Sequence, residues 1–178
     1  MTRAGYAPAE QTNLPKAHVF AFAESIAKQL GFGPGDDIQA LVERLGGKVS
    51  IQDTLTEDPA RSGSLFVESP TKFTIIVPTH TGQLRDRFTI AHELGHFMLH
   101  YMWRRHHGAQ IEGPMMALRK GSDRIEWEAN WFAAAFLMPS SEFSEEYLRC
   151  DRNIAAVAAA FGVSIAAADV RARQLGLA

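Results

Sequence analysis

The chain has 178 residues, of which 46% are hydrophobic and 21% charged, and its formal net charge is −2. These values are typical of an ordinary globular protein with a proper core, and the charge gives no general electrostatic reason to bind nucleic acid. The single cysteine excludes both a disulfide framework and a metal site built from several thiolates.

The first half of the chain predicts a polar tail, two helices and a small sheet. Residues 1–15 are polar and contain proline, so we expect a flexible tail. Apolar residues at helical spacing predict helices over 16–30 and 38–45, the second capped by Asp36 or Asp37. Three short strand-like runs follow, over 48–52, 64–68 and 73–77. This sheet has two possible roles, between which the sequence does not choose. Its exposed edge pairs with an extended substrate peptide, or the sheet only covers the core.

The helix predicted over residues 85–101 carries the most informative motif of the chain, His92-Glu93-Leu94-Gly95-His96. Its apolar residues recur at helical spacing and form one stripe, made of Ile90, Leu94, Phe97, Met98 and Tyr101. His92, Glu93 and His96 share another side of the helix. Two histidines one turn apart reach one metal ion, and the glutamate falls beside the metal's open position, where it takes a proton from water. Because a thiolate cluster is excluded, the pattern favours a catalytic site with three protein ligands.

A third histidine does not complete this site. The motif variant with a histidine six residues after the second is excluded, because that position is Met102. The Cα of His100 lies about 12 Å along the helix axis from that of His92, so the two cannot easily share a metal ion. We interpret His100 as a polar side chain near the helix end, favourable to the negative pole of the helix dipole.

A glutamate on the helix predicted over residues 123–138 is the better candidate. Glu126 lies on a face between two apolar stripes, and a buried carboxylate there needs a partner such as zinc. Glu128 points to the opposite side and is expected to be solvated, so we favour Glu126 over Glu128. Asn130, one turn after Glu126, either accepts a hydrogen bond from a ligand imidazole or satisfies a buried backbone group.

Two further segments flank this second helix. Residues 101–121 form a connection that is long for a compact domain, either a lid over the site or a solvated linker. Residues 153–175 have the outline of a helix-turn-helix. A DNA-reading helix needs polar side chains near its N-terminal end, whereas this one begins with Ile165 and three alanines and carries Arg171 and Arg173 late. We therefore favour packing or partner binding over direct DNA contact.

These elements predict an α+β fold, with a small, mainly antiparallel sheet packed against the motif helix and the second ligand-bearing helix. The helical segment 151–178 is expected to pack on the same domain as residues 16–150. The N-terminal sequence has no apolar stretch typical of a secretory signal, and the longest uncharged run, 153–168, is shorter than the roughly 18 residues of a membrane span. With a single cysteine, which suits a reducing compartment, these features predict a cytoplasmic protein.

The motifs together resemble one family. The run from Arg87 to His96, followed by Glu126-x-Glu128-Ala129-Asn130-x-Phe132-Ala133-Ala134 and Leu137-Met138-Pro139, is similar to the ImmA/IrrE metallopeptidases. The C-terminal Ala160-Phe161-Gly162-Val163-Ser164 and Leu175-Gly176-Leu177 are similar to that family's ending, so the resemblance spans roughly residues 38–177. It implies a zincin-like metallopeptidase domain over residues 16–150, with a thermolysin-like, gluzincin-type core.

The resemblance also implies roles for the motif residues. His92, His96 and Glu126 would bind one Zn²⁺ per chain, and Glu93 would be the general base of a zinc metalloendopeptidase. The implied substrate is a helix-turn-helix (Xre-type) repressor or antitoxin, whose cleavage switches on stress or mobile-element genes.

One part of the catalytic machinery has no clear counterpart in the sequence. Thermolysin-like enzymes often place a downstream histidine or a tyrosine against the oxyanion of the reaction. No histidine follows His107, which departs from that pattern. The candidates, among which the sequence does not choose, are Tyr147, His100, Tyr101 and His80.

The sequence leaves an alternative function open. The zinc fold would then be a metal-binding regulatory module, which binds or senses through a partner repressor without significant proteolysis. Glu93 favours the protease, because a metal-bound scaffold has no chemical need for a base. Neither hypothesis involves a membrane, and the oligomeric state is not predictable from the sequence.

Overall fold

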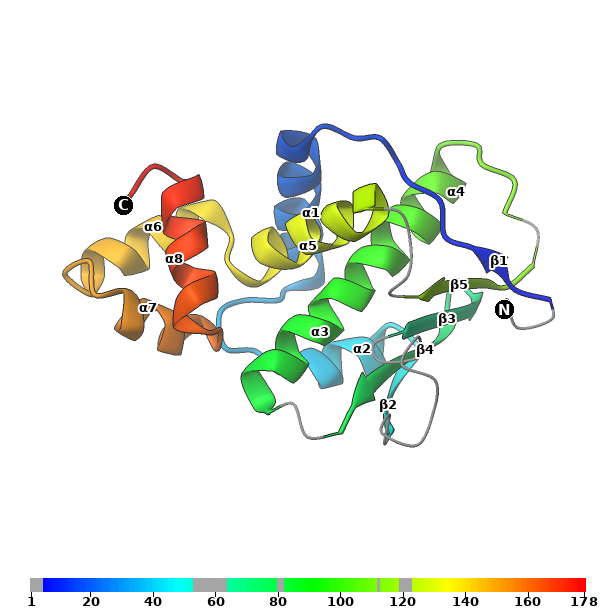
Figure 1. Cartoon of the computed structure of the whole chain (residues 1–178), viewed down its shortest axis with the longest axis horizontal. Helices are drawn as coiled ribbons and strands as arrows, with labels where there is room; N and C mark the ends of the chain where they lie inside the picture. Colours follow the sequence, from blue (N-terminus) through cyan, green and yellow to red (C-terminus); the bar gives the residue numbers. More distant parts are fainter. Residues whose placement is uncertain (1–4, 53–63, 80–81, 112, 119–122) are drawn as a thin grey trace.

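The computed structural model describes residues 5–52, 64–79, 82–111, 113–118 and 123–178. A central helix, α3 (Gln83–Gly95), lies between the sheet and the helix that crosses it (Figure 1). It contacts the sheet through strand β4, and helix α5 (Asp123–Leu137) crosses it on the other side. Helix α1 (Lys16–Leu30) packs in turn against α5. This order encloses the motif helix between the sheet and α5.

The two N-terminal helices begin and end where local signals predict them. α1 ends at Gly31, whose φ of 61° is the left-handed conformation that glycine adopts without strain. α2 (Ile38–Arg44) begins after Asp37, whose carboxylate accepts hydrogen bonds from two backbone N–H groups of the first turn. Both predicted helices are confirmed, and Asp37 rather than Asp36 is the cap.

The strands form one sheet in the order β1-β5-β3-β4-β2. They are β1 (Ala7–Pro8), β2 (Gly47–Gln52), β3 (Ser64–Ser69), β4 (Lys72–Pro78) and β5 (Met115–Leu118). β3 is antiparallel to both β4 and β5, whereas β2 is parallel to β4 and β1 is parallel to β5, so the sheet is mixed. The α+β class and the three predicted strands are confirmed. The prediction of a lid or linker over 101–121 is wrong at β5, which is a strand of the sheet. This strand is too short to show an alternating pattern in the sequence and is defined by its pairing with β3.

The part of the helix that carries the motif is buried. α3 passes directly into a π-helical segment, η2 (His96–Trp103), and then into a short α4 (Arg104–His106). Every residue from 89 to 101 is buried. On the apolar side, Phe97 stacks on Phe73 of β4, with ring centroids 4.2 Å apart. The polar side faces α5 instead of solvent, which is the arrangement that a buried site requires.

The C-terminal part is helical, as predicted. It consists of α6 (Ser140–Arg149), α7 (Ile154–Phe161) and α8 (Ile165–Gln174). Arg171 of α8 is buried: its Nε donates to the carbonyl oxygen of Met138 at 2.9 Å, and its Nη2 to Glu24 of α1 at 2.7 Å. Within the described residues, no single helix is long and apolar enough to cross a membrane. Among these residues, only α7 and α8 taken together reach the length and apolar composition of a membrane span, and the chain bends by 105° between them.

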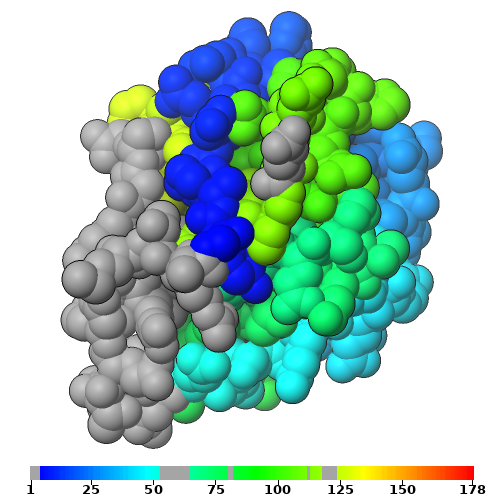
Figure 2. All heavy atoms as spheres, turned by 90° about the vertical axis from the view of Figure 1, so that its right-hand side faces the viewer, coloured from blue at the N-terminus to red at the C-terminus, as the bar shows by residue number. Residues whose placement is uncertain are grey.

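The segment before α1 is attached to the sheet. Ala7 and Ala9 donate backbone hydrogen bonds to the carbonyl oxygens of Pro114 and Met116, at 2.8 and 2.9 Å. Figure 2 shows this segment as a dark-blue band that runs down one face of the molecule. The prediction of a flexible tail is therefore corrected for residues 5–15, because backbone pairing with β5, which composition does not reveal, fixes its path.

Candidate metal centre

Three side chains from neighbouring helices converge where α3 and α5 cross. His92 belongs to α3, His96 is the first residue of η2, and Glu126 lies in the first turn of α5. The two histidine Nε2 atoms are 3.0 Å apart and lie 3.3 and 3.5 Å from the carboxylate oxygens of Glu126. In the part of the chain that the structure describes, this is the one group of three His, Cys, Asp or Glu whose ligand atoms all lie within 4.8 Å of one another. The structure thus brings together the three residues expected to bind a metal ion.

Gly95 lets the two helices approach closely. A Cβ atom at Gly95 would lie 3.0 Å from the carbonyl oxygen of Ala129 and 3.1 Å from its Cα, which is closer than ordinary van der Waals contact. A side chain at this position would push α5 away from α3. Glu126 lies one turn before Ala129, so the same contact sets how far its carboxylate reaches. The pattern His-Glu-x-x-His leaves this position open, and its role is visible only at the crossing.

One hydrogen bond orients His92. Its Nδ1 lies 2.9 Å from Oδ1 of Asn130. Because an amide oxygen only accepts, Nδ1 carries the proton and Nε2 turns its lone pair towards His96 and Glu126. This is the first of the two roles expected for Asn130. Burial lowers the pKa of His92, but hydrogen bonds and the charges of Glu126 and Glu93 outweigh burial and raise that pKa. The surroundings of His92 are therefore electronegative, which favours a bound cation.

His96 is oriented by a buried pair, His100 and Glu128. The Nδ1 atoms of His96 and His100 are 3.0 Å apart, and Nε2 of His100 lies 3.1 Å from Oε2 of Glu128. Both His100 and Glu128 are fully buried. The interpretations of His100 as a helix-end side chain and of Glu128 as solvated are therefore wrong, because η2 and α5 pack against each other and enclose both side chains. One signal was present: His100 follows His96 at the same spacing as His96 follows His92.

The buried charge of Glu128 is compensated by donors from the N-terminal segment and from its own helix. Its carboxylate accepts from the backbone N–H of Thr12 and Asn13, the hydroxyl of Thr12 and Nε of Arg124, at 2.8 to 2.9 Å. Burial raises the pKa of Glu128, but hydrogen bonds from His100, Thr12 and Arg124 outweigh burial and hold the pKa at about 2. Glu128 is therefore ionised at neutral pH and only accepts hydrogen bonds. No local sequence pattern indicates a contact between Thr12 and α5.

The donor set at the crossing fits a divalent metal ion such as zinc. Two imidazoles and one carboxylate are the ligands of a common type of catalytic zinc site. Both Nε2 atoms face the same space as the buried Oε1 of Glu126, which has no hydrogen-bond donor among the described residues. Lone pairs held this close repel one another unless a cation lies between them. Glu93, almost fully buried, follows His92 on the same helix.

The residues considered for oxyanion stabilisation are placed differently. Both ring nitrogens of His100 are already in hydrogen bonds, one with His96 and one with Glu128. His100 therefore cannot stabilise the oxyanion. Tyr101 is buried and stacked on the apolar side of the helix. Tyr147 lies on α6, beyond the C-terminal end of α5, whereas the metal group lies near the N-terminal end of α5 (Figure 1). His80 lies outside the described residues.

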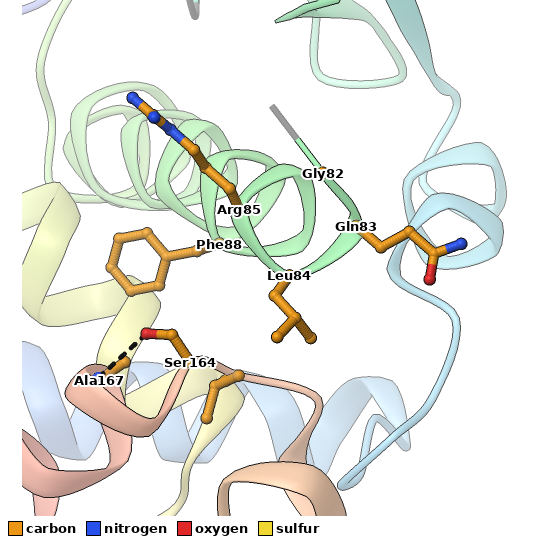
Figure 3. Close-up of a pocket in the computed structure, with 8 residues that line it drawn as sticks. Gly82, Gln83, Leu84, Arg85, Phe88, Ser164 and Ala167 are labelled. Carbon is orange, nitrogen blue, oxygen red and sulfur yellow. Dashed lines mark hydrogen bonds between the residues drawn. The ribbon is translucent and has the colours of Figure 1, made fainter. Parts of the chain in front are cut away.

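A second feature is separate from the metal group. A cavity of about 590 Å³ lies between the start of α3 and the turn from α7 to α8. It is lined by Gly82, Gln83, Leu84, Arg85, Phe88, Val163, Ser164 and Ala167. In Figure 3, Leu84 and Phe88 of α3 point towards the start of α8. None of the three metal-group residues lines this cavity, so it is distinct from the metal centre.

Comparisons with known proteins found a family and a similar fold. The Peptidase_M78 family model, described as the IrrE N-terminal-like domain, matches residues 47–173. A solved structure of a Mycobacterium tuberculosis transcriptional regulator has a similar fold, with a TM-score of 0.59 and 21% sequence identity over 86% of this chain. This chain spans 55% of the length of that structure. No curated protein matches. At this identity, the likeness to the solved structure shows the fold alone.

Proposed function

This chain belongs to the IrrE N-terminal-like family of peptidases, and from that premise we propose that it is a zinc-dependent endopeptidase. The observation that carries the proposal is the convergence of His92, His96 and Glu126 within 4.8 Å of one another, with Glu93 next to His92 in the sequence of the same helix. In this proposal the first three side chains hold the metal ion and Glu93 is the general base.

Each residue has a defined task in peptide hydrolysis. Zinc, when bound, supplies a Lewis acid that polarises the scissile carbonyl and acidifies water. The two histidines contribute neutral imidazoles, and Glu126 contributes one negative charge. Glu93 accepts the proton of the attacking water and delivers it to the leaving amine. Asn130 and His100 keep the two ligand rings in the required orientation.

We propose that the substrate is a helix-turn-helix repressor of the Xre type, or an antitoxin. Cleavage of such a protein would switch on stress or mobile-element genes. Family membership supports a protein substrate. The solved structure of similar fold is named a transcriptional regulator, which supports a role of this fold in regulation.

The test is an unbiased search for new protein N-termini. Zinc-loaded protein and its Glu93→Gln variant are each incubated with soluble extract of the native host. We expect termini that appear only with the wild type, and a loss of cleavage of about 10²- to 10⁴-fold in the variant, because a general base contributes about that factor. The exchange of glutamate for glutamine keeps the size of the side chain and leaves the ligands untouched, so the variant should bind zinc as the wild type does.

Two other outcomes would count against the proposal. Equal cleavage by both proteins would contradict Glu93 as the base. If no termini appear while both proteins bind one zinc ion per chain, the alternative of a metal-binding regulatory module is favoured instead.

A further inference from the structure

A continuous hydrogen-bonded path joins the N-terminal segment to a ligand of the metal group. Thr12 and Asn13 donate to Glu128, and Glu128 accepts from Nε2 of His100. His100 in turn meets Nδ1 of His96 through its own Nδ1. The second ring nitrogen of His92, the other ligand histidine, contacts Asn130 alone, on the exposed side of α5. The two ligand histidines are therefore held in unequal ways.

The direction of every proton in this path follows from its buried end. The carboxylate of Glu128 is surrounded by N–H and O–H donors from Thr12, Asn13 and Arg124, and it accepts in each of these contacts. It therefore accepts from His100 as well, so His100 carries its proton on Nε2. A neutral imidazole has one donor and one acceptor, so Nδ1 of His100 accepts and Nδ1 of His96 donates. His96 is then left with a bare Nε2, which is the atom that points to His92 and Glu126. The carboxylate thus selects the one tautomer of His96 that can bind a metal ion.

The N-terminal segment is built to hold that carboxylate. Consecutive backbone N–H groups of Thr12 and Asn13 both reach it, and Asn13 adopts a φ of 60°, a conformation that few non-glycine residues adopt. Arg124 donates to Glu128 and to the carbonyl oxygen of Leu14, which joins the segment to α5. Closer to the N-terminus, the segment is fixed by the pairing of β1 with β5.

We propose that Glu128 and His100 are positioning residues for the metal ligand His96, and that residues 7–14 form a strap that holds them, so that metal affinity depends on the N-terminal segment. The inference rests on the proposed metal centre, but it does not require proteolysis. The metal ion is held by three side chains, yet its affinity is set in part by a segment that supplies no ligand.

The test measures zinc affinity by competition with a chromophoric chelator. Glu128→Gln should weaken zinc binding about 10- to 100-fold, because an amide can donate to His100, reverse the path and leave a proton on Nε2 of His96. The exposed Glu142→Gln on α6 is the matched control and should leave the affinity unchanged. His100 and Glu128 act in series, so their effects should not add. The double variant, with His100→Phe and Glu128→Gln, should bind zinc no more weakly than the more severe of the two single variants.

The strap is tested by two variants at one position. Thr12→Val removes the hydroxyl, which donates to Glu128 and accepts from the backbone N–H of Leu14, and should weaken zinc binding about threefold to tenfold. Thr12→Ser keeps that hydroxyl and should bind zinc within about twofold of the wild type. These exchanges leave the core untouched, so they test the strap even if Glu128→Gln does not fold.

Two spectroscopic measurements separate positioning from a loss of stability. Nitrogen NMR of the zinc-loaded protein should show His100 protonated at Nε2 and bare at Nδ1. The absorption spectrum of the Co²⁺-loaded protein should change in Glu128→Gln and in Thr12→Val, and be retained in Thr12→Ser.

The outcomes distinguish this inference from the proposed function. Zinc affinity that is unchanged in Glu128→Gln, or equal in Thr12→Val and Thr12→Ser, overturns the inference alone. Weakened binding in the expected variants, with no protein cleaved, supports the inference and counts against the peptidase. A wild type that binds no metal ion overturns both.

Discussion

The α3–α5 crossing and the α7–α8 pair are both close helix contacts, but they are built from different side chains. The crossing buries polar and charged groups, namely His92, Glu93, His96, His100 and Glu128. The α7–α8 pair buries apolar side chains, and Arg171 is its one fully buried charged residue among those described. The crossing therefore depends on which remote group compensates each charge, whereas the pair depends on local caps and apolar packing. Substitutions at the crossing should change metal binding, and those at the pair should change stability alone.

The largest effect is expected for Glu126→Ala. Removal of one of three ligands should lower zinc affinity by more than about 100-fold, beyond the loss expected for a group that only orients a ligand. The metal-free variant should unfold at the same temperature as the metal-free wild type or a higher one, because a buried carboxylate oxygen without a donor is removed. Competition with a chelator and thermal unfolding measure the two quantities. Full zinc retention would contradict the ligand assignment.

At the α7–α8 pair, Arg171→Met should destabilise the fold and spare the metal centre. The change removes the buried contacts with Met138 and Glu24. Breaking a buried ion pair costs about 3–5 kcal/mol, but Glu24 is partly exposed, so we expect about 2 kcal/mol, or about 4–8 °C in Tm. Arg173→Met, which alters an exposed pair with Asp169, is the control and should cost less than about 1 kcal/mol. A change in zinc affinity in Arg171→Met would break the comparison.

The same difference explains how far the sequence predicts the fold. Helices and strands with local signals were predictable: Asp37 caps α2, and alternation indicates β4. β1 and β5 were not, because two and four residues are too few for a pattern and each strand forms only by pairing. The sheet's parallel pairings also depend on strand order, which no local signal determines.

At the metal centre, sequence reasoning found the residues that point inward and missed those that hold them. The spacing of His92 and His96, and the apolar surroundings of Glu126, led to the group that the structure brings together. A helical wheel treats each helix alone and therefore predicts that Glu128 is solvated. Its partners Thr12 and His100 come from two other segments, so only the tertiary structure shows that a charge there can be buried.

Gly95→Ala should affect both stability and metal binding. The added methyl group meets the backbone of Ala129 at about 3.0 Å, and overpacking of this kind costs about 1–3 kcal/mol. The higher helix propensity of alanine offsets up to about 1 kcal/mol, so we expect a net loss of about 1 kcal/mol. Displacement of α5 should also weaken zinc binding about tenfold, by moving Glu126. Arg171→Met is the matched control, since it loses at least as much stability and should bind zinc normally; equal zinc affinity in the two variants would contradict the role of Gly95.

The smallest effects are expected at the caps of the α7–α8 pair. Asn153 accepts from the backbone N–H of Ala155 and Ala156, and Ser164 accepts from that of Ala167. Replacing either cap by alanine should cost about 1 kcal/mol, because backbone donors of the first turn lose their acceptor. The two caps share no partner, so the double variant should lose the sum of the single losses in denaturant unfolding, within about 0.5 kcal/mol. Such additivity would set the pair apart from Glu128 and His100, which act in series; a strongly non-additive double variant would instead show that α7 and α8 are coupled through more than local packing.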